Sequence, residues 1–234
     1  MKMKNKKAEQ IAAKQKHREQ LKAHRRAEPD LERHAPLLNK RPLILIVCEG
    51  KNTEPSYFNQ FKISSATVKS VGEGYNTLSL VNRAIHFAGQ GKYDQIWCVF
   101  DKDDFSETDF NNATQKAQTK KFGIAYSNQS FEYWLILHFE DHQGGGMHRN
   151  DYNGKINNLL KPFDVIFDGD GTKRVTEDFF EILDGTDEKT GKKRVDLAIG
   201  RAERNYNRFD HSNPAKEESS TTVFRLVKEL LKYV

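Results

Sequence analysis

The chain has 234 residues, of which 36% are hydrophobic and 30% are charged, a composition typical of a soluble protein with one main domain and a full core. No apolar stretch approaches the roughly 20 residues that span a bilayer, and residues 1–20 lack the apolar segment of a secretory signal. The two cysteines lie in apolar segments, which indicates a reducing compartment rather than a disulfide framework. These features exclude a membrane protein, and we expect a cytoplasmic one.

Positive charge is concentrated at the start of the chain. Residues 1–42 contain 13 Lys and Arg against 5 Asp and Glu, so this part carries +8 and residues 43–234 carry −3. Residues 5–27 favour a helix by propensity, but Ile11 and Leu21 alone give almost no apolar face, so we expect this helix to be exposed. Prolines at 29, 36 and 42 then predict a linker.

The chain therefore divides into a basic N-terminal arm, residues 1–40, and a folded domain, residues 41–234. A basic arm either binds nucleic-acid phosphates through a salt-dependent attraction or is a solvated helix that contacts nothing. The candidate phosphate-binding residues of the arm are Lys14, Lys16, Arg18, Arg25 and Arg26.

The first segment of the folded domain is a run of six apolar residues, 43–48, which ends on Glu49 and Gly50. Such a short, partly β-branched run suits a strand that is covered on both faces, as in a parallel sheet. Glycine permits a tight turn, so Glu49 is expected at the carboxyl end of the strand, where open α/β sheets place their ligands.

A second apolar run, residues 95–100, ends on Asp101, Asp103 and Asp104. If the two strands are parallel neighbours, these aspartates and Glu49 meet at one edge of the sheet, and carboxylates from distant sequence converge on a divalent metal in this way. We therefore predict Glu49, Asp101, Asp103 and Asp104 as metal ligands. Hard oxygen ligands favour Mg²⁺, or Mn²⁺, as the ion.

Strand and helix patterns alternate along the domain. Short strands are predicted at 66–71 and 123–126, and helices at 53–61, with Thr53 as the N-cap, 78–89, 107–121 and 131–139. This alternation predicts an α/β fold, a mostly parallel four-stranded sheet flanked by helices on both faces. Additional C-terminal helices are expected near 152–161, 175–184, 193–206 and 223–234.

Three further charged residues lie near the predicted edge. Glu132, in an apolar helix directly after the fourth strand, either faces water or projects toward Glu49 and Asp101. Lys51 and Lys102 flank the carboxylates and either hold a phosphate of nucleic acid or screen repulsion. The pattern suits metal-assisted phosphodiester chemistry, but receiver-type phosphoacceptor domains and haloacid-type phosphatases also cluster aspartates at strand ends.

Three motifs narrow these alternatives: the segment from Val47 to Pro55 with Tyr57 and Phe58, the segment from Phe100 to Asp103, and the segment from Ser127 to Leu135 with His138 and Phe139. Together they closely resemble the RloB-like family over about residues 41–234. The resemblance implies a Toprim-like fold, in which Glu49 matches the Toprim glutamate and Asp101 and Asp103 match its Asp-x-Asp. It also implies a setting in bacterial or archaeal defence, often with an ATPase partner.

One family pattern is interrupted in this chain. The family's C-terminal Asn-Pro-Ser-Thr-x-Val occurs here as Asn213 and Pro214, then residues 215–219, then Ser220, Thr221, Thr222 and Val223. The role of this segment is not evident from the sequence.

Two functions are compatible with this pattern. The first is a Mg²⁺-dependent Toprim nuclease that cleaves RNA, for instance transfer RNA, or DNA in antiphage defence, with Glu49, Asp101, Asp103 and Glu132 as catalytic residues. The second is a non-catalytic adaptor or regulatory module that uses the Toprim scaffold to bind nucleic acid or a partner ATPase. The intact acidic positions favour the enzyme, because an adaptor has no need for carboxylates that repel one another.

Overall fold

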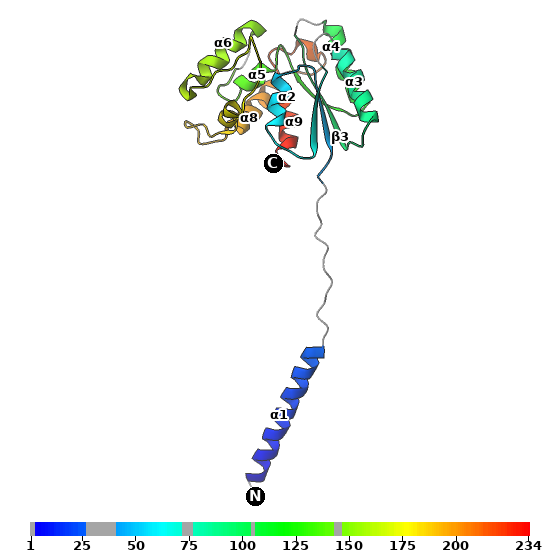
Figure 1. The fold of residues 1–234 in the computed structure, drawn as a ribbon, viewed down its shortest axis with the longest axis vertical. Coiled ribbons are helices and arrows are strands. Elements are labelled where there is room, and N and C mark those ends of the chain that lie inside the picture. The colour runs from blue at the N-terminus through cyan, green and yellow to red at the C-terminus, as the bar shows by residue number, and fades with distance from the viewer. Residues whose placement is uncertain (1–2, 27–40, 72–76, 104–105, 143–146) are drawn as a thin grey trace. The chain divides into compact units, whose positions relative to one another are not determined.

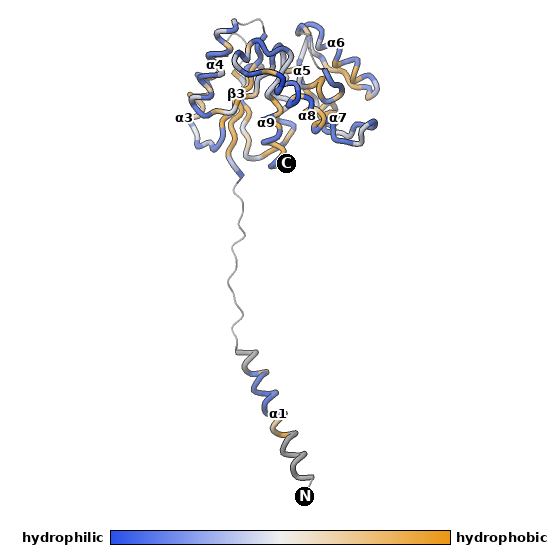
Figure 2. The backbone as a smooth tube through the Cα atoms, turned by 180° about the vertical axis from the view of Figure 1, so that it is seen from behind, coloured by the Kyte–Doolittle hydropathy of each residue, from blue (hydrophilic) through white to orange (hydrophobic). Residues whose placement is uncertain are grey.

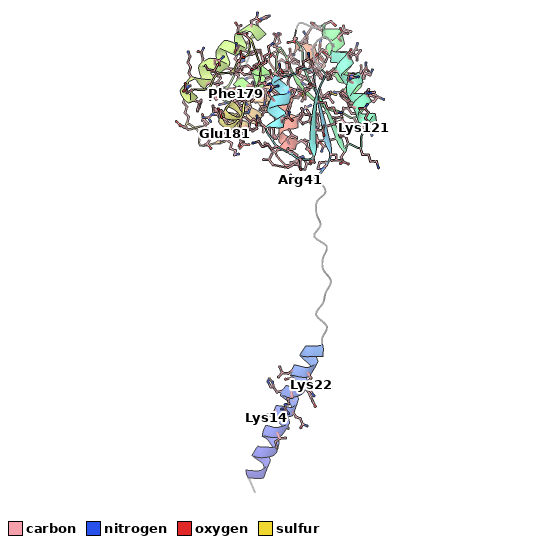
Figure 3. The ribbon with its side chains drawn as sticks, in the orientation of Figure 1. Lys14, Lys22, Arg41, Lys121, Phe179 and Glu181 are labelled. Atoms are coloured by element: carbon pink, nitrogen blue, oxygen red, sulfur yellow. The ribbon has the colours of Figure 1, made fainter. Side chains whose placement is uncertain are left out.

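The structure is a computed structural model that describes residues 3–26, 41–71, 77–103, 106–142 and 147–234. The chain forms two compact units, residues 1–40 and 41–234, each of which is described by itself (Figure 1). The first unit contains one helix, α1 (Met3–Arg26), whose residues 11–22 are all exposed. Lys14 and Lys22 project from it (Figure 3).

The second unit is built on a sheet of four parallel strands, β1 (Ile44–Cys48), β2 (Ala66–Ser70), β3 (Gln95–Asp101) and β4 (Gly123–Ser127). Their order in the sheet is β2-β1-β3-β4. Cys48 of β1 pairs with Val99 of β3, and Asp101 of β3 pairs with Ser127 of β4. The carboxyl ends of the strands therefore lie along one edge of the sheet.

The helices and 3₁₀ turns of this unit occur between and after the strands. They are α2 (Thr53–Asn59), α3 (Thr77–Gly89), α4 (Glu107–Thr119), α5 (Glu132–Ile136), α6 (Arg149–Leu160), η1 (Lys161–Phe163), α7 (Glu177–Asp184), α8 (Arg194–Tyr206), η2 (Pro214–Lys216) and α9 (Val223–Leu230). In the described ranges, no helix has both the length and the apolarity needed to cross a membrane.

Alternate side chains of β1, β3 and β4 enter two hydrophobic cores. Ile44 and Ile46 pack with the buried residues of α2, α5, α6, α7, α8 and α9 on one face, whereas Leu45 and Val47 pack with α3 and α4 on the other (Figure 1). All five residues of β1 are buried because a strand at the centre of a doubly covered sheet has no face in water. The chain around β3 is coloured as hydrophobic in Figure 2.

The predicted α/β class and the parallel four-stranded sheet with helices on both faces are confirmed, and the arrangement is consistent with a Toprim-like fold. Two local predictions are wrong. Thr53 is not the N-cap of α2, because Asn52 occupies that position and Thr53 is the first helical residue. The apolar helix expected over 131–139 is limited to Glu132–Ile136, and turns follow it.

The interrupted C-terminal segment, residues 213–222, forms what we call the strap along the outer edge of β4. Thr222 accepts a hydrogen bond through Oγ1 from the backbone N–H of Tyr126 at 2.9 Å, and its own N–H donates to the Tyr126 carbonyl at 2.8 Å. Asn128 donates from its N–H to the Ser220 carbonyl at 2.8 Å and from its side chain to the Pro214 carbonyl at 2.8 Å. The strap therefore satisfies backbone groups that an uncovered edge strand would expose.

Removing the Thr222 hydroxyl tests this role. Thr222→Val keeps the shape of the side chain but leaves the buried Tyr126 N–H without an acceptor, so we expect a loss of about 1–3 kcal/mol in the free energy of unfolding. Urea denaturation measures it. The matched control is Thr119→Val on the exposed end of α4, with an expected change within about 0.5 kcal/mol. If both substitutions lower the free energy of unfolding equally, the strap does not stabilise the fold through Thr222.

Candidate active site

Carboxylates from two neighbouring strands meet at the carboxyl edge of the sheet. Glu49 directly follows β1, and its N–H donates to the Val99 carbonyl at 2.9 Å, which continues the ladder between β1 and β3 by one residue. The N–H of Asp101, the last residue of β3, donates to Glu49 Oε2 at 3.3 Å. Parallel pairing thus places the two carboxylates predicted from sequence beside each other.

The third carboxylate of the site is that of Glu132, which follows β4 at the start of α5. The N–H of Phe131 donates to Asp101 Oδ2 at 3.1 Å, which fixes the start of α5 against the end of β3. Glu132, the first residue of α5, is half-buried and accepts hydrogen bonds from Thr53 Oγ1 at 3.4 Å and from Ser130 Oγ. The sequence left two alternatives for Glu132, a side chain that faces water or one that projects toward the other carboxylates. The observed geometry is that of the second.

Asp103 is held in a left-handed backbone conformation, with φ of 43°. Its N–H donates to the carbonyl of Gln129 at 3.2 Å, and Gln129 is itself left-handed with φ of 83°. Such conformations cost energy in residues other than glycine, although aspartate tolerates them better than most residues do. The loops after β3 and β4 are therefore tied together in a strained arrangement beside the carboxylates.

Glu54 is a site residue that the sequence reasoning did not single out. Its side chain is buried, with 5% of its surface exposed, and its Oε1 accepts a hydrogen bond from the Gly50 N–H at 3.2 Å. A Cβ atom on residue 50 would lie 2.2 Å from Glu54 Oε2, so only glycine allows this close approach. The signal was available in the sequence as a glutamate four residues after a glycine, at the amino end of a helix that follows the first strand.

The clustered carboxyl groups have strongly perturbed acidities. Burial, with repulsion from Asp103 and Glu54 adding to it, raises the pKa of Glu49 to about 8. Burial, with repulsion from Glu132 and Asp103, raises the pKa of Glu54 to about 7. The pKa of Asp101 is raised well above its ordinary value by burial and then by Glu54 and its other acidic neighbours. Negative charges that lie close together with little solvent favour the protonated form of each carboxyl group. Functional sites commonly contain groups whose pKa is shifted in this way.

Two oxygen atoms of this cluster fit the demands of a hard cation. Glu49 Oε1 and Asp101 Oδ1 are buried and accept no hydrogen bond from any described residue. Among the described residues, no three His, Cys, Asp or Glu side chains already surround one point as a complete metal cage. Mg²⁺ does not require such a cage, because it keeps several waters and is commonly held by one or two carboxylates. The residues therefore fit a Mg²⁺ or Mn²⁺ ion bound through Glu49 and Asp101.

The other predicted site residues are placed as follows. Asp103 lies beside Glu49 and Asp101, whereas Asp104 lies outside the described residues. Lys51 is exposed in the turn after β1, and Lys102 is half-buried with its Nζ donating to the Asp103 carbonyl at 3.2 Å. The arm residues Lys14, Lys16 and Arg18 are exposed on α1, and the backbone of Arg25 and Arg26 forms the end of the same helix.

Comparison with known proteins adds one match. The model of the family described as RloB-like protein matches residues 44–230, which is most of the chain and includes every acidic residue of the site. No curated protein matches the chain, and no solved structure matches it.

The acidic cluster predicts how the stability of the metal-free protein depends on pH. Glu49 and Glu54 hold protons in the folded state that the unfolded chain releases near pH 4.3, so their stabilising contribution is complete below that pH and is lost as the pH rises through about 7 to 8. We expect the melting temperature in EDTA to fall from pH 5.5 to 8.5. Thermal melts of wild type and Glu49→Gln measure this fall, which should be shallower in the variant. Parallel curves for the two proteins would contradict the assignment.

Proposed function

This chain belongs to the RloB-like family, and we propose that it is a metal-dependent nuclease that hydrolyses phosphodiester bonds of nucleic acid. The observation that supports the proposal most directly is the meeting of Glu49 and Asp101 at the ends of adjacent parallel strands, with one oxygen of each buried and unbonded. Buried carboxylates that repel one another are costly, and a bound cation removes that cost.

Each acidic residue has a distinct role in the proposed reaction. Glu49, Asp101 and Asp103, with Asp104 as a further predicted ligand, hold Mg²⁺ or Mn²⁺. When bound, the ion neutralises charge on the phosphodiester and lowers the pKa of water, which supplies the nucleophile. Without a metal, the pKa of Glu49 is raised to about 8, mainly by burial, and we propose Glu49 also as the group that accepts or donates a proton. The predicted phosphate ligands beside them are Lys51 and Lys102.

Glu132 acts in this scheme by orienting groups at the site. Each of its two oxygens accepts one hydrogen bond, from the hydroxyls of Thr53 and Ser130, and these bonds fix the carboxylate relative to α2 and to the loop after β4. A carboxylate held in this way can orient a water or a neighbouring ligand without itself reacting. Glu54, which is bound to the Gly50 N–H, supports the turn that carries Glu49.

The family resemblance suggests the biological setting of the proposed reaction. We propose a role in antiphage defence, with RNA, for instance transfer RNA, as the preferred substrate over DNA, and an ATPase encoded nearby as a partner. The preference for RNA is by analogy with other defence proteins of the Toprim type. An adaptor without catalysis is the competing function, and the experiments below separate the two.

Cleavage assays test the proposed activity. Purified protein is incubated with transfer RNA, single-stranded DNA and plasmid, in Mg²⁺, Mn²⁺ or EDTA, with and without a partner ATPase. We expect cleavage in either metal and none in EDTA, and a loss of at least about 10²–10⁴-fold in Glu49→Gln and Asp101→Asn.

The matched control for these variants is Glu181→Gln, because Glu181 is exposed on α7 (Figure 3) and belongs to a different element. Its cleavage rate should equal that of wild type. If neither metal supports cleavage of any substrate, and if Glu49→Gln and Asp101→Asn still protect cells from phage, the adaptor becomes the better description.

Glu132→Gln tests the orienting role separately. We expect cleavage to fall about 10- to 100-fold, the effect typical of a group that orients metal ligands, while the free energy of unfolding stays constant or increases because a like charge is removed from Glu54 and Asp101. Cleavage rates and urea denaturation measure both quantities. A variant that is fully active would place Glu132 outside the catalytic machinery.

The arm is tested through the salt dependence of binding. In the full chain, we replace Lys14, Lys16 and Arg18 by Gln and expect the slope of log affinity against log salt to become shallower by about 2–3, because each phosphate contact contributes about 0.7–0.9. Fluorescence anisotropy with a labelled RNA measures the slope. The control replaces the exposed Lys92, Lys189 and Lys192 of the folded unit. Equal slopes in wild type and the arm variant would rule out phosphate contacts by these residues.

A further inference from the structure

A small cavity is lined in part by Glu132 and Ser130, and its other lining residues have no role in the function proposed above. Its volume is about 110 Å³, which is well below the roughly 300–1,000 Å³ of sites that enclose a whole small ligand. It therefore suits one part of a larger substrate. The cavity lies between the start of α5, the first turn of α6 and the loop before α7, and is lined by Ser130, Glu132, Asn150, Tyr152, Asn153, Phe167, Gly169, Asp170 and Lys173.

Tyr152 is the unusual member of this lining. The residue is 1% exposed and its ring packs in the core, yet its hydroxyl has no hydrogen-bond partner among the residues that the structure describes. An unsatisfied buried hydroxyl is costly, and phenylalanine would fill the same space without that cost. Burial, followed by nearby acidic groups including Asp101 and Glu132, raises the pKa of Tyr152, so the hydroxyl stays protonated and can donate a hydrogen bond.

The charge of the lining disfavours a phosphate as the occupant. Glu132 and Asp170 contribute two carboxylates, whereas Lys173 is the one cation among the described lining residues. Asp170 is already fixed by the side-chain amide of Asn153 at 2.8 Å. The carboxylate oxygens of Glu132 and Asp170 need a donor, and the Tyr152 hydroxyl needs an acceptor. The occupant that fits both demands is a neutral group that can donate and accept hydrogen bonds.

The aromatic residues of the lining disfavour a nucleobase. Tyr152 and Phe167 are each only 1% exposed, so neither offers an open ring face on which a base could stack. Stacking on aromatic side chains is the usual way in which proteins hold an unpaired base. A sugar hydroxyl needs no ring face, and it can replace the hydrogen bonds of a water that it displaces from a polar cavity.

We propose that this cavity binds a ribose of the nucleic acid next to the reacting phosphate, and that Tyr152 and Glu132 recognise its 2′-hydroxyl. Tyr152 donates a hydrogen bond to the hydroxyl oxygen and Glu132 accepts a hydrogen bond from the hydroxyl, so the contact selects RNA over DNA at this position. This inference rests on the proposed function for its substrate, and it assigns Tyr152 as a specificity residue rather than a catalytic one.

The experiment compares one single-stranded sequence prepared as RNA, as 2′-O-methyl RNA and as DNA. Binding is measured by fluorescence anisotropy in EDTA, where no metal contributes, and cleavage is measured in Mg²⁺. Wild type should bind RNA about 3- to 10-fold more tightly than 2′-O-methyl RNA, which loses only the hydrogen bond to Glu132, and more tightly again than DNA, which loses both hydrogen bonds. Tyr152→Phe should lose about 3- to 10-fold of the preference for RNA over DNA, because one of the two hydrogen bonds is removed, while its affinity for DNA is unchanged.

Two control variants make the test specific. Tyr57→Phe removes another buried tyrosine hydroxyl, on α2 and away from this cavity, and should keep the full preference for RNA. Lys173→Ala should lower affinity for RNA, 2′-O-methyl RNA and DNA by similar factors, if at all. The melting temperature of Tyr152→Phe should equal or exceed that of wild type, because no hydrogen bond within the protein is lost.

The outcomes separate this inference from the proposed nuclease. Cleavage without any preference for RNA in binding overturns the ribose site and leaves the nuclease standing. If the protein binds RNA more tightly than DNA, if Tyr152→Phe reduces that preference, and if no substrate is cleaved, the ribose site is supported and the nuclease is overturned. If Tyr152→Phe has a lower melting temperature but the same preference for RNA, the Tyr152 hydroxyl stabilises the fold and does not bind ribose. This result also overturns the inference.

Discussion

Mutual repulsion among clustered carboxylates is the constraint on which the rest of this structure depends. Glu54 is buried and Glu49 and Asp101 are half-buried, so solvent screens the three carboxylates only partly, and the pKa of each is raised mainly by loss of solvent. Desolvated like charges destabilise a fold unless they are protonated, hydrogen-bonded or neutralised by a cation. Such a cluster at a sheet edge costs stability, and functional sites often carry a cost of this kind.

Backbone groups of the surrounding fold hold the cluster together. The N–H groups of Gly50, Asp101 and Phe131 each donate to a carboxylate of the site. These donors occupy loops at the ends of three strands, so their positions depend on the register of the sheet and on the two cores that cover it. Backbone dipoles stabilise ionised oxygens without supplying a competing cation, which leaves room for a metal.

The strap has a structural role, because it binds both β4 and the loop that leads to the site. It binds the outer edge of β4 through Tyr126, and it binds Asn128 in the loop that leads to Glu132. The five residues that interrupt the family pattern include Glu217, which is buried and accepts a hydrogen bond from the Tyr126 hydroxyl at 3.2 Å. The interruption therefore does not break the packing of this segment on β4, because Pro214 and Ser220 still reach the loop.

The sequence alone was sufficient for the sheet, its covered faces and the pairing of Glu49 with Asp101, because short apolar runs define strands and parallel connections bring their carboxyl ends together. It was not sufficient for Glu54 or for the ends of α5. Glu54 belongs to the site because its side chain folds back onto Gly50, and that approach depends on where α2 packs. Tertiary structure likewise decided that Tyr152 lines a cavity beside Glu132, since periodicity identifies a buried ring but not the surroundings of its hydroxyl.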